Sequence, residues 1–321
     1  MTENILEVQQ LTRRFGSLTA INAVDLHVRR GERFALIGPK GAGKTTLISV
    51  LCTLIRPTAG IAHVDDCQLG RENPGIRGRI GAVFSESLLD RLLTVEENLR
   101  VRASFYGIRG KKATAAILRA ATATGLETNL RTRYGRLPAE ERRRADIARA
   151  LVHAPSLLFL DDPAAGLEPD ARDAILDITR SLAAGSGTTV FLASREIGDG
   201  MDADRIAIMD RGRVMADGTP LELLERFAAD RLRLVPRNDA ACRETLVKLL
   251  NSEGYRRLPV AAEDGSVLDI AIGNSMGALL LVNRIVHLID SFEMVRGTMH
   301  DAYQQALRPD VRSADGKGAL R

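Results

Sequence analysis

The sequence predicts an α/β domain that is followed by a small α+β domain. First, short apolar strands alternate with helical patterns between residues 44 and 210, which is typical of a sheet covered by helices. Second, residues 33–51 read as a strand, a glycine-rich loop and a helix. Third, the chain has 321 residues, which is more than one domain usually holds, and its pattern changes after residue 213.

The N-terminal part is rich in expected strands. Residues 5–11 and 23–29 are strand-like, and a turn at residues 30–32 leads into the apolar strand at 33–37. We therefore expect a β-rich entry to a parallel core. Further apolar strands are expected at residues 80–84, 157–161, 188–193 and 205–209.

A helical subdomain is expected at about residues 95–153. Thr94 and Glu97 have the spacing of a capping box, in which each side chain bonds the other residue's backbone N–H, so a helix should begin there. A second helix is expected at 113–124. A third, basic helix is expected at 140–152.

The C-terminal part has a different order of elements. One more helix is expected at 219–228, and residues 231–295 then read as strand, helix, strand, strand, helix, strand. That order is the split βαβ arrangement of ferredoxin-like domains. We therefore divide the chain into domains at 1–228 and 229–308. The polar, glycine-containing tail at 309–321 is expected to be disordered.

Composition excludes some classes of protein. Aromatic residues make up 4% of the chain, there is no Trp, and the net charge of +4 is modest, so nothing favours binding of nucleic acid. The three cysteines, Cys52, Cys67 and Cys242, lack metal-ligand spacing and suit a reducing cytosol. No signal-peptide pattern and no apolar run of about 18 residues is present, so we expect a soluble, cytoplasmic protein.

The glycine-rich loop predicts binding of a nucleoside triphosphate. Residues 38–45 read Gly-Pro-Lys-Gly-Ala-Gly-Lys-Thr, with a strand before them and a helix after them. In such a loop, backbone N–H groups converge on phosphate oxygens while Lys44 reaches phosphate and Thr45 reaches Mg²⁺. The alternative is a plain glycine-rich turn. The expected binding residues are Gly38, Pro39, Lys40, Gly41, Ala42, Gly43, Lys44, Thr45 and Thr46.

Two carboxylates follow a second buried strand. Residues 157–160 read Leu-Leu-Phe-Leu, and Asp161 and Asp162 come next. A carboxylate at the C-terminal end of a central strand can hold Mg²⁺ opposite a phosphate loop, so we expect Asp161 and Thr45 to be the metal ligands. The alternative is an aspartate that only caps the next turn.

The order of these motifs resembles the ATP-binding subunit of ABC transporters. A phosphate loop, a helical insert, a basic helix, Leu-Leu-Phe-Leu-Asp-Asp-Pro and Ala-Gly-Leu-Glu-Pro at 165–169 follow one another, over about residues 3–228. The resemblance implies an ABC-type P-loop NTPase domain with bound ATP and Mg²⁺. It also implies that Phe15 stacks on adenine, although Phe15 could equally be a core residue. The segment 231–307 resembles the C-terminal extension of daunorubicin-resistance-type drug exporters.

The chain departs from the family pattern where phosphate should be contacted from the opposite subunit. The family signature Leu-Ser-Gly-Gly-Gln corresponds to Leu137-Pro-Ala-Glu-Glu141. Pro138 offers neither a hydroxyl nor an N–H, and Glu140 and Glu141 bring negative charge to the helix end that should attract an anion. The helix start is therefore kept, whereas its phosphate-binding chemistry is expected to be lost.

Three catalytic positions also depart from the family. The usual Gln is Ser85, which is too short to reach Mg²⁺ and water, and the usual catalytic Glu is Asp162, one methylene shorter. The switch His is Arg195, which cannot accept a hydrogen bond from water; an exposed salt-bridge residue is the other interpretation of Arg195. Glu168 in place of the usual Asp is a milder change.

We therefore expect an ATP-binding subunit of an ABC exporter of multidrug or antibiotic type that hydrolyses ATP weakly. The implied partners are a polytopic membrane permease and a second ATP-binding subunit, in a homodimer or heterodimer, and the implied location is the inner face of the cell membrane. A competing hypothesis is a soluble ATP-dependent switch of the ABC family that acts without a permease. The C-terminal domain is expected to regulate the protein or to form dimer contacts, since it shows no catalytic cluster.

Overall fold

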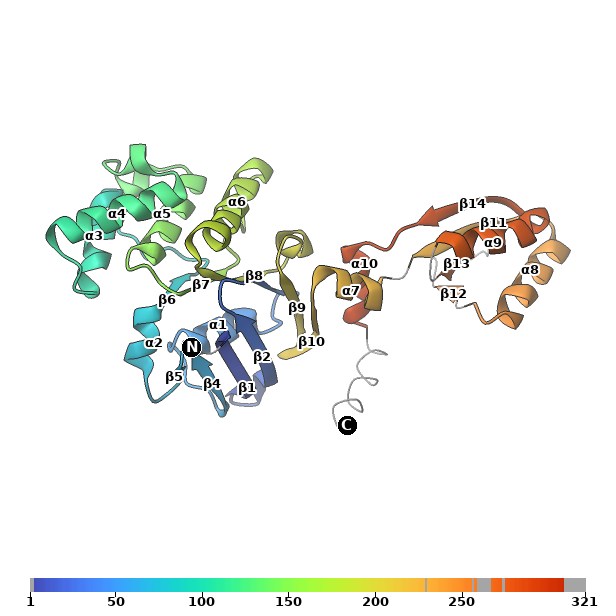
Figure 1. Ribbon diagram of the computed structural model, residues 1–321, viewed down its shortest axis with the longest axis horizontal. Helices are drawn as coiled ribbons and strands as arrows, with labels where there is room; N and C mark the ends of the chain where they lie inside the picture. Colours follow the sequence, from blue (N-terminus) through green and yellow to red (C-terminus); the bar gives the residue numbers. More distant parts are fainter. Residues whose placement is uncertain (1–2, 229, 256, 259–266, 273–274, 309–321) are drawn as a thin grey trace. The chain divides into compact units, whose positions relative to one another are not determined.

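The computed structural model describes residues 3–228, 230–255, 257–258, 267–272 and 275–308. By its internal contacts the chain divides into two compact units, Met1–Pro220 and Leu221–Arg321. The expected disordered tail at 309–321 lies outside the described residues. Each unit is treated by itself below, with the element labels of Figure 1.

The core of the first unit is a six-stranded sheet in the order β10-β9-β3-β8-β7-β6. Its strands pair in parallel except for β10, which is antiparallel to β9. All residues of β3, β7 and β8 are buried, as expected for strands covered on both faces. The strands are β3 (Arg33–Ile37), β6 (Ile80–Val83), β7 (Leu157–Asp161), β8 (Thr189–Ser194), β9 (Arg205–Asp210) and β10 (Arg213–Gly218).

A second, antiparallel sheet in the order β2-β1-β4-β5 forms the β-rich entry. Apolar residues of its strands share one hydrophobic cluster with β3 and with the helix that follows β3. The bounds are β1 (Asn4–Phe15), β2 (Leu18–Arg29), β4 (Ala59–Val64), β5 (Cys67–Gln68), α1 (Lys44–Leu51) and α2 (Asn73–Arg79). The sequence predicted β1 and β2, and both strands are longer than expected.

Three helices, α3 (Val95–Phe105), α4 (Gly110–Thr124) and α5 (Ala139–Leu151), gather into a helical subdomain with its own hydrophobic cluster. The predicted capping box is confirmed: the Thr94 hydroxyl accepts from the Glu97 backbone N–H, and the Glu97 carboxylate accepts from the Thr94 N–H. Further along, α6 (Pro169–Ser186) packs beside α5 and β8. Individual sequence patterns had not singled out α6, β4, β5, α2 or β10.

The second unit contains a four-stranded antiparallel sheet in the order β12-β13-β11-β14. With its helices this gives the βαββαβ sequence that the split βαβ arrangement requires. The elements are α7 (Pro220–Phe227), β11 (Arg231–Pro236), α8 (Ala240–Ser252), β12 (Arg257–Leu258), β13 (Leu268–Ala271), α9 (Ser275–Ile285), β14 (Ile289–Val295) and α10 (Met299–Ala306). An additional helix, α10, follows the last strand.

The boundary between the units differs from the expected one. The sequence placed α7 in the first domain, which was to end at residue 228, whereas the contacts assign residues from Leu221 onward to the second unit. One reason is the close approach of Gly297, where an added Cβ would lie 1.8 Å from the Ala228 carbonyl oxygen. The segment after α7 is thus packed against the segment after β14.

Candidate nucleotide site

The site lies at one edge of the parallel sheet, beyond the C-terminal ends of the adjacent strands β3, β8 and β7. Ile37 at the end of β3 pairs with Ser194 at the end of β8, and Asp161 at the end of β7 pairs with Ala193. Open α/β sheets bind their ligands at this edge. The register therefore brings the glycine-rich loop, the carboxylates and the segment that follows β8 together.

The loop between β3 and α1 needs glycine at two positions for steric reasons. A Cβ at Gly38 would lie 2.2 Å from the Met209 carbonyl oxygen, and one at Gly43 would lie 2.4 Å from the Ala20 carbonyl oxygen. Gly43 also has a φ of 108°, which side-chain-bearing residues rarely adopt. The loop is thus folded back against neighbouring backbone, and no side chain caps the start of α1. The N–H groups of the first helical turn have no acceptor within the helix and can take an anion.

Lys44 is buried inside the loop. Its Nζ donates to the carbonyl oxygen of Gly38 at 2.6 Å and to that of Pro39 at 3.1 Å. Burial lowers the pKa of Lys44, and the carboxylates of Asp162 and Asp161 oppose that shift. The ammonium group is therefore held by neutral carbonyls, which a phosphate group can displace as a stronger, charged acceptor.

Thr45 and Asp161 face each other across the site. The Thr45 side chain hydrogen-bonds to the carboxylate of Asp161, a residue that is 4% exposed. Burial raises the pKa of Asp161, the neighbouring Asp162 raises it further, and the Thr45 hydrogen bond and Lys44 lower it. A hydroxyl and a carboxylate in this arrangement fit Mg²⁺, which commonly takes one or two protein oxygens and completes its octahedron with water and phosphate oxygens. No cluster of three or more His, Cys, Asp or Glu that could hold another kind of metal occurs among the described residues.

One cavity of about 600 Å³ joins the expected binding and catalytic residues. Its lining includes Asp161 and all three altered catalytic positions, Ser85, Asp162 and Arg195. The loop contributes Lys40, Gly41, Ala42, Gly43, Lys44, Thr45 and Thr46, whereas Gly38 and Pro39 lie behind it and hold Lys44.

Asp162 and Arg195 form an ion pair at the edge of this cavity. The Arg195 Nε lies 2.7 Å from the Asp162 Oδ2, and the Asp162 backbone N–H donates to the Ala193 carbonyl. Asp162 has a φ of 53°, in the left-handed region that aspartate tolerates better than most residues. Arg195 therefore fits both interpretations: it forms a salt bridge with Asp162, and its side chain also lines the cavity.

Phe15 is not among the residues that line the cavity. Its ring is 42% exposed, and the Arg13 guanidinium lies over it at 4.3 Å. Phe15 pairs with Leu18 across the β1–β2 turn, and Leu18 does line the cavity. Phe15 is thus a partly exposed residue near the site, with Arg13 over its ring, and it is not a core residue.

Sequence reasoning missed two contributions to the cavity. Leu18, Thr19 and Ala20 line it from the start of β2, and Arg211 and Gly212 line it from the turn between β9 and β10. The Gly212 N–H donates to the Ala42 carbonyl at 2.8 Å, which ties that turn to the loop. The sequence marked only a change of pattern after residue 213. The approach of the turn at 211–212 to the loop depends on the strand order β10-β9-β3, which no local pattern reveals.

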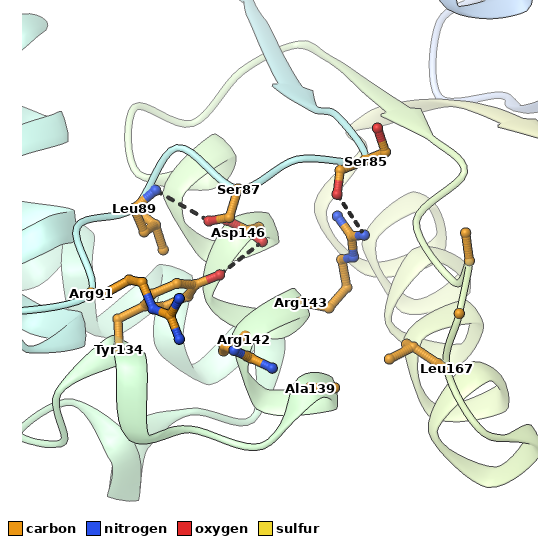
Figure 2. A pocket seen from close by; sticks show the side chains of 12 residues that line it. Ser85, Ser87, Leu89, Arg91, Tyr134, Ala139, Arg142, Arg143, Asp146 and Leu167 are labelled. Atoms are coloured by element: carbon orange, nitrogen blue, oxygen red, sulfur yellow. Dashed lines mark hydrogen bonds between the residues drawn. The ribbon is translucent and has the colours of Figure 1, made fainter.

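A smaller cavity, of about 380 Å³, lies next to Ser85 and the start of α5 (Figure 2). Here the Arg143 Nη1 donates to the Phe84 carbonyl at 2.9 Å, and the Ser87 hydroxyl donates to the buried Asp146 carboxylate at 2.5 Å. Burial raises the pKa of Asp146, and its hydrogen bond to Ser87 opposes the shift. The segment after β6 is therefore bound to α5 by side chains of α5.

The start of α5 has the composition expected from the sequence. Pro138 precedes the helix, and no side chain caps its N-terminus. Glu140 forms an ion pair with Arg144, and the Glu141 carboxylate accepts from Asn129 at 2.9 Å. Both acids are thus engaged with neighbours on the helical subdomain.

The comparisons with known proteins agree with this geometry. The ABC transporter family profile matches residues 21–165. The daunorubicin resistance ATP-binding protein DrrA3 of Streptomyces coeruleorubidus is 36% identical over 238 residues, which cover 74% of this chain and 75% of that protein. The Nod factor export ATP-binding protein I of Paraburkholderia xenovorans is 31% identical over 252 residues, which cover 78% and 83%.

A solved structure has the same cassette fold. It is the dimeric, post-hydrolysis state of the ATP-binding cassette MJ0796 bound to ADP and Pi, which is 25% identical, has a TM-score of 0.61, and covers 67% of this chain and 98% of that one. No helix among the described residues is long and apolar enough to cross a membrane. The strand order, the loop geometry and the relatives lead to one conclusion: this chain belongs to the ABC transporter family, as an ATP-binding subunit related to drug-resistance and export ATPases.

Proposed function

We propose that this chain binds Mg·ATP, couples the binding to a separate membrane permease of an exporter, and hydrolyses ATP slowly. ABC ATPase domains generally bind and hydrolyse ATP. In this chain Lys44 and the first turn of α1 would hold the phosphates, and Thr45 and Asp161 would hold Mg²⁺. The magnesium ion, held by Thr45 and Asp161, would neutralise part of the phosphate charge.

The ion pair between Arg195 and Asp162 carries the proposal of slow hydrolysis. A group that positions or deprotonates the attacking water needs a free carboxylate oxygen or imidazole nitrogen within hydrogen-bond reach. The Arg195 Nε donates to the Asp162 Oδ2 at 2.7 Å, which offsets the carboxylate charge and fixes its orientation away from water, and the guanidinium group has no acceptor to offer. Ser85 contributes only a short hydroxyl side chain to the same cavity. Positioning of water would therefore be poor even with nucleotide and Mg²⁺ in place.

Exposed apolar side chains support a permease partner. Leu88, Leu92 and Phe105, in the loop before α3 and at its end, are 71%, 76% and 72% exposed. Large apolar side chains that remain so exposed often mark protein interfaces. A chain without a membrane-spanning helix among its described residues would then act at the inner face of the membrane, bound to a polytopic protein.

ATP affinity and turnover, measured on the purified chain, test the catalytic half of the proposal. We expect micromolar or tighter binding of Mg·ATP, which Lys44→Ala abolishes, together with phosphate release far below that of ordinary ABC ATPases. If the chain instead hydrolyses ATP at the rate of ordinary ABC ATPases, and Lys44→Ala eliminates this activity, then the proposal of slow hydrolysis is wrong. The proposal of ATP binding would still stand.

Affinity purification from solubilised membranes tests the permease. A tagged chain should recover a polytopic membrane protein, and Leu92→Ser or Phe105→Ser should reduce its recovery. Leu118→Ser, at an exposed site on α4, is the matched control. Recovery of a soluble partner alone would favour the switch hypothesis.

A further inference from the structure

Two helices of the helical subdomain carry positive charge that the nucleotide site does not use. Residues 98–126, which include most of α3 and all of α4, hold six basic residues and no Asp or Glu. The whole chain has a net charge of only +4, so its remaining residues together are net negative. Positive charge is therefore concentrated on α3, α4 and the turn that connects them (Figure 1).

Four of these basic residues face solvent without a partner. Arg109, Lys111, Lys112 and Arg119 are exposed, and their side chains form no hydrogen bond or ion pair within the described part of the chain. Arg109 precedes α4, and Lys111 and Lys112 lie in its first turn. Arg119 follows Lys112 by seven residues, or two turns, and so lies on the same side of the helix. We call these four residues the basic surface.

The acids closest along the chain do not neutralise this charge. Glu96 is paired with Arg100 at 2.6 Å, and the Glu97 carboxylate accepts from the Thr94 N–H. The next acid, Glu127, lies beyond the other end of α4, about 22 Å from the first turn of that helix. That distance exceeds the screening length of about 8 Å at physiological salt. The first turn of α4 therefore presents its positive charge to the solvent.

The positions of Lys111 and Lys112 are unfavourable for the helix itself. The first turn of α4 contains no acidic residue, and no side chain caps its N-terminus. Because this end of a helix is the positive end of its dipole, acids stabilise it and cations oppose it. Residues that break a local rule without a compensating contact are typical of functional surfaces. The structure of α4 alone therefore does not account for its lysines.

The buried side of α4 determines what kind of contact its outward side can make. Apolar residues of α4, among them Ala113, Ile117 and Ala121, are packed in the hydrophobic cluster of the helical subdomain. This apolar face is therefore not available for insertion into lipid, as it is in helices that lie within a membrane interface. The basic surface can instead make an ionic contact with a negatively charged surface.

The place of the basic surface in the chain indicates which surface that is. Phe105, which is 72% exposed and is assigned above to the permease interface, lies four residues before Arg109. Four residues of chain span at most about 14 Å. A permease bound at Phe105 would therefore bring the basic surface close to the cytoplasmic leaflet, whose anionic lipids attract clustered Lys and Arg.

We propose that the basic surface binds the anionic phospholipid headgroups of the membrane that holds the permease. The contact is electrostatic and reversible, because it uses exposed ammonium and guanidinium groups and no apolar face. It adds to the permease contact and orients the helical subdomain toward the membrane. Its placement at the membrane rests on the proposed function, whereas its affinity for anionic lipid does not.

Co-sedimentation of the full chain with vesicles, without nucleotide or permease, tests the proposal. The chain should bind phosphatidylcholine vesicles that contain about a third phosphatidylglycerol and should not bind phosphatidylcholine alone. The variant Lys111→Gln/Lys112→Gln/Arg119→Gln should partition about a hundredfold more weakly, since each basic residue near an anionic surface contributes a factor of about five. Raising the salt concentration from about 0.1 M to about 1 M should abolish binding, because the screening length falls from about 10 Å to about 3 Å.

A variant with the same net charge is the matched control. Arg56→Gln/Arg71→Gln/Arg77→Gln removes three positive charges from exposed residues elsewhere in the first unit and should bind the anionic vesicles like the unaltered chain. Glutamine is a good helix former, and it removes unfavourable cations from the first turn of α4. The α4 variant should therefore melt no lower than the unaltered chain, which separates loss of the lipid contact from misfolding.

The proposal is overturned if the unaltered chain does not bind anionic vesicles at low salt, or if the α4 variant and the control lose equal affinity. Salt-sensitive binding of a single-stranded RNA oligonucleotide without binding of vesicles would also overturn it, and would assign the basic surface to nucleic acid. Failure to bind ATP or to recover a permease would instead contradict the proposed function. The vesicle experiment contains neither and would still decide whether the basic surface binds lipid.

Discussion

The guanidinium group of Arg195 bonds the carboxylate of Asp162 at the edge of the nucleotide cavity, with 2.7 Å between Nε and Oδ2. The two residues follow the adjacent strands β8 and β7, so the sheet itself brings them together. Their side chains are 47% and 20% exposed, and an ion pair that exposed contributes at most about 1 kcal/mol to stability. The pair therefore matters more for chemistry than for folding.

The pair predicts that hydrolysis improves when both members are replaced. Asp162→Glu lengthens the carboxylate by one methylene, and Arg195→His supplies a nitrogen that can accept a hydrogen bond from water. We expect the double variant to release phosphate at least about tenfold faster than the unaltered chain, since a well-placed acid or base contributes on the order of a hundredfold. Steady-state phosphate release at saturating Mg·ATP measures this.

Two controls accompany that experiment. Lys44→Ala in the double variant should abolish turnover, and melting temperatures should stay within a few degrees because the ion pair is exposed. A decrease of turnover in Arg195→Ala would contradict the inhibitory role of the pair and assign Arg195 a favourable one.

The sequence predicted the strands and the loop well because those signals are local. Residues 33–37 and 157–161 are apolar runs with the bounds that β3 and β7 have, and the Thr94 capping box starts α3 as expected. The order of the motifs along the chain also predicted that the C-terminal ends of β3 and β7 lie at the same edge of the sheet. The altered positions Ser85, Asp162 and Arg195 all line the cavity for the same reason.

Features that depend on long-range contacts could not be predicted in this way. The pairing of Arg195 with Asp162 joins residues 33 positions apart, and the side-chain rotamers that make it have no sequence pattern. The approach of Gly212 to the loop depends on strand order, and the assignment of α7 to the second unit depends on packing near Gly297. The basic helix expected at 140–152 gave no sign that Arg142 and Arg143 line a cavity beside Ser85.

Removal of the Asp161 carboxylate should weaken nucleotide binding only when Mg²⁺ is present. Asp161→Asn keeps the size of the side chain and the Thr45 contact, yet it removes the charge opposite the loop. We expect Mg·ATP affinity to fall about tenfold or more, with little change in a chelator, since a hydrogen-bonded charge contributes about 1.5 to 3 kcal/mol. Calorimetric titration with and without EDTA measures the difference. Equal losses in both conditions would argue against Asp161 as a metal ligand.

Phe15 should contribute to binding through its exposed ring. Stacking of a base on an aromatic side chain is worth about 1 to 3 kcal/mol, so Phe15→Ala should weaken ATP binding roughly tenfold or more, whereas Phe15→Tyr should not. Phe105→Ala, which removes another exposed aromatic ring from the helical subdomain, is the control. Fluorescence titration with a labelled ATP analogue is suitable. Unchanged affinity in Phe15→Ala would show that the ring does not contact the nucleotide and packs only against Arg13.

His153 should make the stability of the first unit depend on pH. Its ring stacks on Tyr106 with centroids 3.8 Å apart, and its Nε2 lies 2.9 Å from the Ile80 carbonyl oxygen. Burial lowers the pKa of His153 to about 4 from 6.5, and Arg102 and Arg149 contribute to the shift while the Ile80 hydrogen bond opposes it. Below pH 6.5 the unfolded chain therefore takes up a proton that the folded chain does not, and stability falls until about pH 4.

After allowance for partial exposure of the ring, that loss should amount to about 2 kcal/mol between pH 7.5 and pH 4.5. Urea unfolding of the full chain at both pH values measures it, and His153→Gln should lose less stability over the same interval. His27→Gln, at an exposed site on β2, should behave like the unaltered chain. Because other groups also titrate, the difference between the two variants is the decisive quantity. If it is zero, then His153 has the same pKa in the folded and unfolded chain, and its burial against Tyr106 does not persist in solution.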